Sequence, residues 1–282
     1  RLSKRLDLLK AGRGVDPRQQ TLRATIAWSY DLLNEDERLL FEALSVFRGG
    51  CTLEAAEEVC DADVDTLQSL IDKSLVRRQG ARFWMLETIQ EYATERLEER
   101  GEENDLRRRH ADHFLSRAED AAAGGPSALP EAGVRLQDEL DNIRRARGRL
   151  IASGDAEREA RLAVATLLAL WTQAGLRELK AWLVSALDRS AELDPGLRAD
   201  ALGAAALAAA NLGESEVARE YARESLEIAR ERNDKRQIEW ALRVLSFDEP
   251  DLDERRHMLH ECEAVLRELG DDGGLGWVTF LL

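Results

Sequence analysis

Apolar residues recur every three or four positions along most of the chain, which is the spacing of one face of an α-helix. In the first hundred residues this pattern predicts four helices, because each apolar stripe is followed by a polar or glycine-containing break. The last three begin directly after the capping residues Asn34, Thr52 and Asp63, and Glu37 completes a capping box with Asn34. The predicted helices cover residues 21–33, 35–47, 53–59 and 64–73.

Residues 74–86 depart from the helical pattern. Two short β-prone runs flank Gln79-Gly80, which is typical of a tight hairpin turn. Helices followed by a single hairpin predict a winged-helix domain, although a fold of this kind does not by itself fix a function.

The second half of the chain reads as helices alone and repeats itself. One helix is expected over residues 102–123, a loop over 124–130 and another helix over 134–151. Beyond these, Trp240 and Trp277 each stand six residues after an Asp, at a separation of 37 residues. This period is longer than the ~34 residues of a tetratricopeptide repeat (TPR). Helix pairs that cannot bury their apolar faces alone stack into a solenoid, so a TPR-like array is expected.

These patterns predict a mainly all-α protein in three parts. We expect residues 1–100 to form a winged-helix domain with the end of a preceding helical subdomain, 101–155 a connecting helical region, and 156–282 TPR-like repeats. Because the chain begins at Arg1 and its last residues are apolar, it is interpreted as a fragment of a longer protein.

Composition narrows the classes of partner. The 282 residues carry a formal net charge of −15, which disfavours binding to nucleic acid or to anionic membranes except through local patches. No apolar run is long enough for a membrane span, and no secretion leader is apparent, so a cytoplasmic location is predicted. The three cysteines are scattered, which favours reduced thiols.

Direct DNA binding is the first function to weigh for a winged helix. The expected recognition helix, residues 64–73, carries Asp65 and Asp72 but only one Lys. A helix in the major groove normally brings cationic or amide side chains to bases and phosphates. Arg77, Arg78 and Arg82 on the hairpin could contact phosphates, but they could equally form a charged strand edge that blocks strand pairing. Direct nucleic acid binding is therefore an alternative rather than the main hypothesis.

Two histidine pairs have the spacing of metal ligands. His110 and His113, like His257 and His260, stand three residues apart and so share a helix face. Neither pair has a full set of partners at fixed spacing, and both border apolar stripes, so packing is preferred and no metal site is predicted. No catalytic constellation stands out either, and the chain is predicted not to be an enzyme.

Four segments carry a resemblance to a known family. They are residues 18–33, 44–56, 70–76 and 85–93 (RQQTLRATIAWSYDLL, LSVFRGGCTLEAA, LIDKSLV and MLETIQEYA). The chain resembles the bacterial, mostly actinobacterial, STAND-class signal-transduction ATPases. These are NB-ARC-like and are often fused to LuxR-type, antibiotic-regulatory or adenylate cyclase modules. The resemblance implies an ATP-binding core ahead of the winged helix, a helical array after it, and a winged helix that acts as a lid on the nucleotide.

The resemblance also marks one candidate nucleotide-sensing position. Met85, Leu86 and Glu87 fall where related NB-ARC proteins carry Met-His-Asp, whose His reads the β-phosphate. Leu86 cannot donate a hydrogen bond, which argues against direct phosphate sensing here. The chain also lacks the G-x-x-x-x-G-K-[ST] phosphate loop. We therefore expect no cofactor in this chain, and ATP or ADP with magnesium in the full-length protein.

The repeats are the expected site of effector binding. If the first helix of each pair lines the concave face, the partner-binding residues include Gln173, Asn211, Gln237, Trp240 and Phe247. Trp240 has two interpretations, a core residue between stacked helix pairs or an aromatic anchor exposed in the groove.

The preferred hypothesis is a regulatory, effector-sensing module of a cytoplasmic bacterial STAND-type ATPase that regulates transcription. Its repeats would bind a protein, peptide or small molecule, and its winged helix would pass that event to the nucleotide-binding core. One alternative is a TPR scaffold for protein–protein interaction with a purely structural winged helix. Another is DNA binding through the winged helix.

Overall fold

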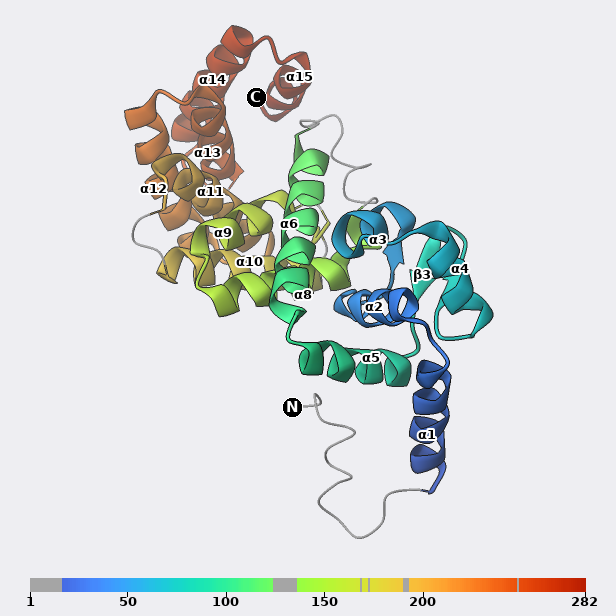
Figure 1. The fold of residues 1–282 in the computed structure, drawn as a ribbon. Coiled ribbons are helices and arrows are strands. Elements are labelled where there is room, and N and C mark those ends of the chain that lie inside the picture. Colours follow the sequence, from blue (N-terminus) through green and yellow to red (C-terminus); the bar gives the residue numbers. More distant parts are fainter. Residues whose placement is uncertain (1–16, 124–135, 168, 172, 190–192, 248) are drawn as a thin grey trace. The chain divides into compact units, whose positions relative to one another are not determined.

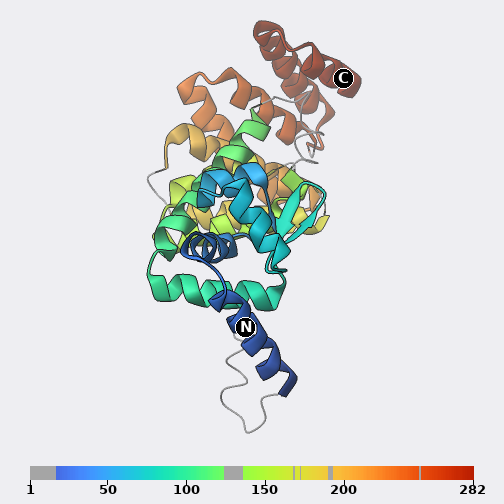
Figure 2. The same ribbon diagram turned by 45° about the vertical axis from the view of Figure 1, so that its right-hand side comes forward.

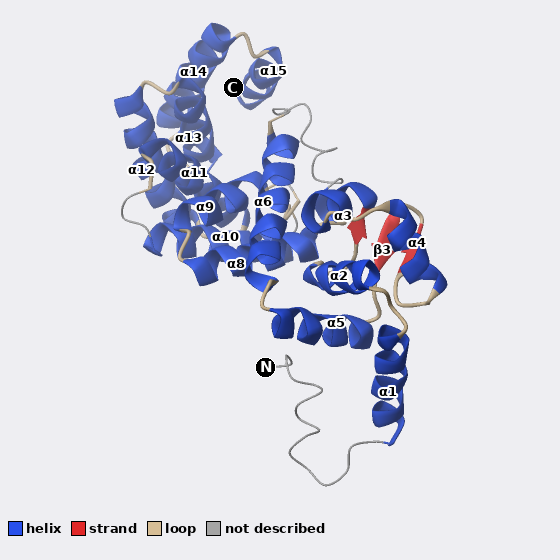
Figure 3. Ribbon diagram, in the orientation of Figure 1, coloured by secondary structure: helices blue, strands red, loops and turns tan. Residues whose placement is uncertain are grey.

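The protein was analysed as a computed structural model, which describes residues 17–123, 136–167, 169–171, 173–189, 193–247 and 249–282. The chain divides into two compact units, Arg1–His113 and Phe114–Leu282, and each is described by itself. Helices dominate both units (Figure 3). This confirms the prediction of a mainly all-α fold. The finer three-part division stays a prediction.

The first unit combines helices with a small sheet (Figure 1). Its helices are α1 (Pro17–Asp31), α2 (Glu35–Ala43), the 3₁₀ turn η1 (Leu44–Val46), α3 (Leu53–Cys60), α4 (Val64–Asp72), α5 (Glu87–Arg100) and the first part of α6 (Glu103–Ala122). Its strands are β1 (Cys51–Thr52), β2 (Arg77–Gln79) and β3 (Arg82–Trp84).

The sheet is antiparallel, in the order β1-β3-β2. The hairpin of β2 and β3 was predicted, and Gly80 lies in its turn with φ +60°. The sequence analysis missed β1, which pairs Cys51 with Phe83. Along the chain, helix α2 is followed by strand β1, by helices α3 and α4, and by strands β2 and β3.

The predicted caps are all present. The Asn34 side chain accepts from the Glu37 amide, and the Glu37 side chain accepts from the Asn34 amide. Thr52 caps α3 and Asp63 caps α4. Each cap satisfies backbone donors that a helix cannot satisfy itself, so these starts follow from local sequence.

Glu37 also ties α2 to α4. Its side chain is buried and accepts hydrogen bonds from Lys73 and Ser69. These bonds to Lys73 and Ser69 stabilise the carboxylate and lower the pKa of Glu37 from 4.5 to about 2.

A pH titration tests how much the hydrogen bonds to Glu37 stabilise the fold. Because the pKa of Glu37 is lower in the folded state, its stabilisation is present above about pH 4.5 and is lost as the pH falls towards about 2. The total is on the order of 2–3 kcal/mol. Urea unfolding of wild type and Glu37→Gln at several pH values is expected to converge at low pH. The exposed neighbour Asp36 provides a control, since Asp36→Asn should follow wild type throughout; curves for Glu37→Gln that stay parallel to wild type would contradict the prediction.

Polar contacts hold α1 in the first unit. Tyr30 donates to the buried carboxylate of Glu42, and Arg100 pairs with the same carboxylate at 2.7 Å. Arg23 pairs with Glu95 on α5. Ile26 and Leu33 are buried, whereas Leu22 is 45% exposed. Helix α1 is therefore oriented by the polar contacts of Arg23 and Tyr30 as well as by its apolar residues.

The second unit is a succession of paired helices (Figures 1 and 2). They are α8 (Leu140–Ser153), α9 (Ala156–Ala165), α10 (Gln173–Arg189), α11 (Pro195–Asn211), α12 (Ser215–Arg232), α13 (Lys235–Phe247), α14 (Leu252–Leu269) and α15 (Asp272–Leu281). The expected helix over 134–151 is wrong in its extent, because residues 138–139 form a turn before α8. The start of the chain, where the end of a preceding helical subdomain is expected, and the loop at 124–130 lie outside the described residues.

The helices α9/α10, α11/α12 and α13/α14 pack as consecutive antiparallel pairs, and α11 also contacts α9 and α13. The helices α11 and α12 have 17 and 18 residues, which accounts for a period longer than that of a usual TPR. The helix α11 is rich in Ala and buried on most of its circumference, as expected for a helix with neighbours on all sides.

One hydrogen bond recurs with the repeat. Ser225 on α12 donates to the Ala199 carbonyl of α11 at 2.8 Å. Cys262, 37 residues later on α14, contacts the Glu239 carbonyl of α13 at 3.6 Å. Both side chains are buried, so the small residue at this repeat position links the two helices of its own pair.

A fully buried acid joins α8, α9 and α10. Glu159 has no exposed surface and pairs with Arg147 at 2.7 Å and with Arg189. Arg147 also lies over the Trp182 ring, with its guanidinium carbon 5.0 Å from the ring centroid. Three helices therefore meet at a charged core position, where removal of one partner is costly.

Candidate functional site

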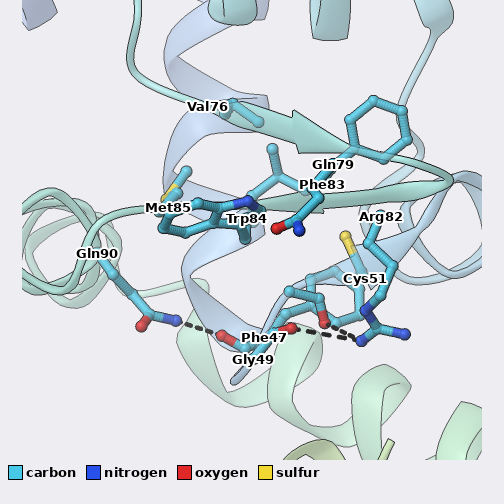
Figure 4. Close-up of a pocket in the computed structure, with 12 residues that line it drawn as sticks. Phe47, Gly49, Cys51, Val76, Gln79, Arg82, Phe83, Trp84, Met85 and Gln90 are labelled. Atoms are coloured by element: carbon cyan, nitrogen blue, oxygen red, sulfur yellow. Dashed lines mark hydrogen bonds between the residues drawn. The ribbon is translucent and has the colours of Figure 1, made fainter. Parts of the chain in front are cut away.

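A pocket of about 440 Å³ opens in the first unit between η1, the sheet and the start of α5 (Figure 4). Most of its walls are apolar. They are formed by Leu44, Phe47, Val76, Phe83, Trp84 and Met85 together with Gly49, Gly50, Cys51, Gln79, Arg82 and Gln90. Its size is within the range of small-ligand sites.

Gly50 lines this pocket and allows a tight turn before β1. Gly50 has φ +84°, and a Cβ at this position would come within 2.5 Å of the Phe83 carbonyl oxygen, so only Gly lets β1 approach β3. Arg82 donates to the Gly50 carbonyl at 3.1 Å, and Gln90 donates to the Phe47 carbonyl (Figure 4). Gln90 also donates to the Ser45 carbonyl. These hydrogen bonds occupy carbonyl groups of the loop. The pocket has mainly apolar walls and a polar rim, so it can accommodate an apolar group.

The candidate sensor position lies at this pocket. Met85 contributes to its wall, and Leu86 is the half-buried residue that precedes α5. Glu87 is exposed in the first turn of α5, where an acidic side chain favours the helix dipole. The Leu86 side chain has no hydrogen-bonding group, so this position offers apolar contact rather than a phosphate ligand.

The predicted partner-binding residues of the array do not form one group. The side chain of Gln173 lies outside the described residues. Asn211 donates to the Leu207 carbonyl of its own helix at 2.9 Å. Gln237 is half-buried, and its buried side-chain oxygen has no hydrogen-bond partner among the described residues.

Trp240 and Phe247, by contrast, are brought together through two further residues. The Arg243 guanidinium carbon lies 4.7 Å from the Trp240 ring centroid and 6.0 Å from that of Trp277. Phe247 meets Trp277 edge to face, with centroids 5.5 Å apart. We call Trp240, Arg243, Phe247 and Trp277 the aromatic–arginine cluster.

The sequence analysis missed Arg243. Trp240, Arg243 and Phe247 are spaced three and four residues apart, so a shared face of α13 was available as a signal. The contact between α13 and α15 could not be predicted from this spacing, because it depends on how the last helices pack. Trp240 itself is half-buried and packs against the core of the array, whereas Trp277 is 44% exposed. The repeat-related tryptophans therefore have different surroundings.

The histidines make ordinary packing and pairing contacts. His110 is buried, with its ring centroid 5.4 Å from that of Phe47, and the Nδ1 of His113 lies 2.7 Å from Glu58. His257 is exposed, and His260 lies 3.6 Å from Glu263. Across the residues that the structure describes, no group of three or more His, Cys, Asp or Glu has the arrangement of a metal site.

None of the three cysteines, all of which lie among the described residues, forms a disulfide bond. Burial raises the pKa of Cys262 to about 12 and raises that of Cys60 well above its usual value. These shifts make the two thiols poor nucleophiles.

No helix among the described residues is long and apolar enough to cross a membrane.

Comparison with known proteins gives relatives that are longer than this chain. No protein-family model matches it. Over 194 residues it is 38% identical to a candidate HTH-type transcriptional regulator of Mycobacterium tuberculosis, Rv0890c; the match covers 64% of this chain and 22% of the relative. It is 37% identical over 116 residues to the uncharacterised M. tuberculosis protein Rv0894, covering 37% and 29% of the two chains. The chain thus spans about a fifth to a third of the length of these relatives.

Solved structures with a similar fold include one of a signal-transduction ATPase. It is the crystal structure of a signal transduction ATPase with numerous domains (STAND) with a tetratricopeptide repeat sensor, from Pyrococcus horikoshii. The TM-score is 0.50 at 17% sequence identity, and the match covers 95% of this chain and 43% of the other. The two proteins share a mainly helical fold with a TPR-like array.

Proposed function

We propose that the chain is the regulatory, effector-sensing part of a STAND-type ATPase that controls transcription. Its helix pairs bind an effector, and its first unit, a winged helix, passes that event to a nucleotide-binding core. The observation that carries the proposal is the fold match to a STAND protein with a TPR sensor, which extends over 95% of this chain and so includes both units. The sequence similarity to candidate transcriptional regulators supports the same role.

The winged-helix part of the proposal rests on topology and on the pocket beside β3. The order of helices and strands is that of a winged helix, and the pocket presents an apolar wall that includes Met85. The donor set does not suit a nucleotide phosphate, because Leu86 has no donor and the walls are mainly apolar. We infer that this unit contacts the core through packing and that ATP with magnesium binds on the core itself.

Calorimetry tests the division of labour between this chain and the core. The isolated chain is expected to show no heat of binding with ATP and magnesium, because the phosphate loop is lacking.

Thermal unfolding in the presence of metabolite and peptide libraries is expected to identify a compound that raises the melting temperature of the array. Hydrogen exchange with that compound should then change protection in α5 and the hairpin. Micromolar ATP binding, or an effector that leaves the first unit unchanged, would contradict the proposal.

DNA binding through the hairpin is a second candidate, favoured by one observation. Arg77 and Arg78 are exposed on the outer strand β2 and lie over the rings of Trp84 and Phe83. No carboxylate pairs with either of them among the described ion pairs. The exposed acids Asp65 and Asp72 on α4 oppose this function. Duplex binding that weakens steeply with salt and is lost in Arg77→Gln/Arg78→Gln would establish it.

A further inference from the structure

Asp61 ends α3 in a backbone conformation that usually belongs to glycine. Its φ is +53°, in the left-handed region, and its amide closes the last turn by donating to the Glu57 carbonyl. At the ends of α5, α8 and α14 the equivalent left-handed residue is a glycine, namely Gly101, Gly154 and Gly270. A left-handed backbone is less favourable for Asp than for Gly, so a side chain at this place indicates a role of its own.

The Asp61 carboxylate holds α6 on the end of α3. Arg109 of α6 donates to both carboxylate oxygens of Asp61, at 2.5 and 2.8 Å, and also to the Glu58 carbonyl at 2.8 Å. One turn later on the same helix, the Nδ1 of His113 lies 2.7 Å from a carboxylate oxygen of Glu58. We call these contacts of Arg109 and His113 with Asp61 and Glu58 the α3–α6 clamp.

The same part of α6 contacts the wall of the pocket. His110 is 2% exposed, and its ring centroid lies 5.4 Å from that of Phe47. Phe47 lines the pocket, and its carbonyl accepts a hydrogen bond from Gln90 of α5. Because buried side chains are closely packed, a displacement of α6 reaches the pocket wall and α5 through this one ring.

The helix α6 belongs to both units. The division between them falls inside it, between His113 and Phe114, and its sequence contains neither Pro nor Gly, which commonly kink helices. Beyond the division, Glu119 accepts two hydrogen bonds from Arg161 of α9, at 2.7 and 2.9 Å. The helix α9 also carries Glu159, the buried acid that joins α8, α9 and α10. One helix therefore contacts α3 in the first unit and α9 in the second.

We propose that α6 couples the array to the first unit and that Asp61 makes this coupling effective. A shift of α9 displaces Glu119, α6 moves as one body, and the α3–α6 clamp passes that movement to α3 and Phe47. Coupling between sites is carried by packed side chains, ion pairs and rigid elements of this kind. This inference rests on the proposed function, in which the array receives an effector, and it names the route by which that event reaches the pocket.

Hydrogen exchange of the whole chain, with no effector added, tests the proposal. Glu159→Gln loosens the array at α9, and it is expected to speed amide exchange in η1, β1 and β3 by about fivefold, the lower limit of typical coupling between sites. When Asp61→Gly is also present, Glu159→Gln is expected to change exchange in the array but not in η1, β1 and β3. Asp61→Gly alone is expected to melt like wild type by circular dichroism, because glycine adopts the left-handed turn readily.

Two further variants separate coupling from folding. Arg109→Gln opens the α3–α6 clamp without altering the backbone of α3 and is expected to uncouple the units as Asp61→Gly does. Asn233→Gly makes a matched change at the left-handed end of α12 and is expected to leave the coupling intact.

The proposal is overturned if Glu159→Gln leaves exchange in η1, β1 and β3 unchanged, if its effect persists in both variants of the α3–α6 clamp, or if Asn233→Gly also abolishes it. Because no effector is used, a failure to find one would defeat the proposed function without changing this result.

Discussion

Replacing Glu159 by alanine is expected to lower the free energy of unfolding by about 3–5 kcal/mol. The carboxylate is fully buried between Arg147 and Arg189, so its removal leaves two guanidinium groups without their shared counter-charge. Burial already lowers the pKa of Arg147, which indicates that this cation is held in a poorly solvated position. Urea denaturation followed by circular dichroism measures the loss.

Glu119→Ala provides the matched control. Glu119 pairs with Arg161 at 2.7 Å, but both side chains are more than a third exposed, so the loss is expected to stay below about 1 kcal/mol. If Glu159→Ala costs no more than Glu119→Ala, the buried triad does not hold α8, α9 and α10 together. Glu159→Gln, which keeps the shape and removes the charge, is expected to fall between the two.

Trp240→Ala is expected to cost about 3–4 kcal/mol, near the lower end of the range for large aromatic residues in cores. One edge of the indole lies against α11, where a Cβ on Gly203 would come within 2.9 Å of Trp240 Cδ1. Arg243 covers one face of the ring, so the substitution leaves a cavity and also exposes the guanidinium. Thermal and urea unfolding both report the change.

The companion variant is Trp277→Ala. Because its side chain is 44% exposed, the expected loss is within about 1 kcal/mol. This pair of variants decides between the two interpretations of the repeated tryptophan, since Trp240 is half-buried against the core of the array and Trp277 is 44% exposed. Equal losses in the two variants would show that the repeat positions are equivalent after all.

Elements with a local chemical cause could be predicted from the sequence. Asn34, Thr52 and Asp63 begin helices because each satisfies amides within three residues, and Gly80 begins the hairpin turn because Gly tolerates positive φ. The strand β1 could not be predicted, because two residues gain their partners only from β3, some thirty positions later.

The missed parts of the candidate site have the same cause. Trp240 and Phe247 were selected by repeat position, but their link through Arg243 and Trp277 depends on the packing of α15 beside α13. The burial of Glu159 likewise depends on arginines contributed by two other helices. Helical periodicity assigns a residue to a face, but it does not say which charges meet across that face.

The burial of α11 has a mechanical consequence for the array. This helix contacts α9, α10, α12 and α13, so it cannot shift without moving four neighbours. Its many Ala and Gly residues have no alternative side-chain rotamers that could absorb strain. The helix α15 packs chiefly on α14 and is largely exposed. Within the described part of the array, a displacement is therefore costlier at α11 than at α15.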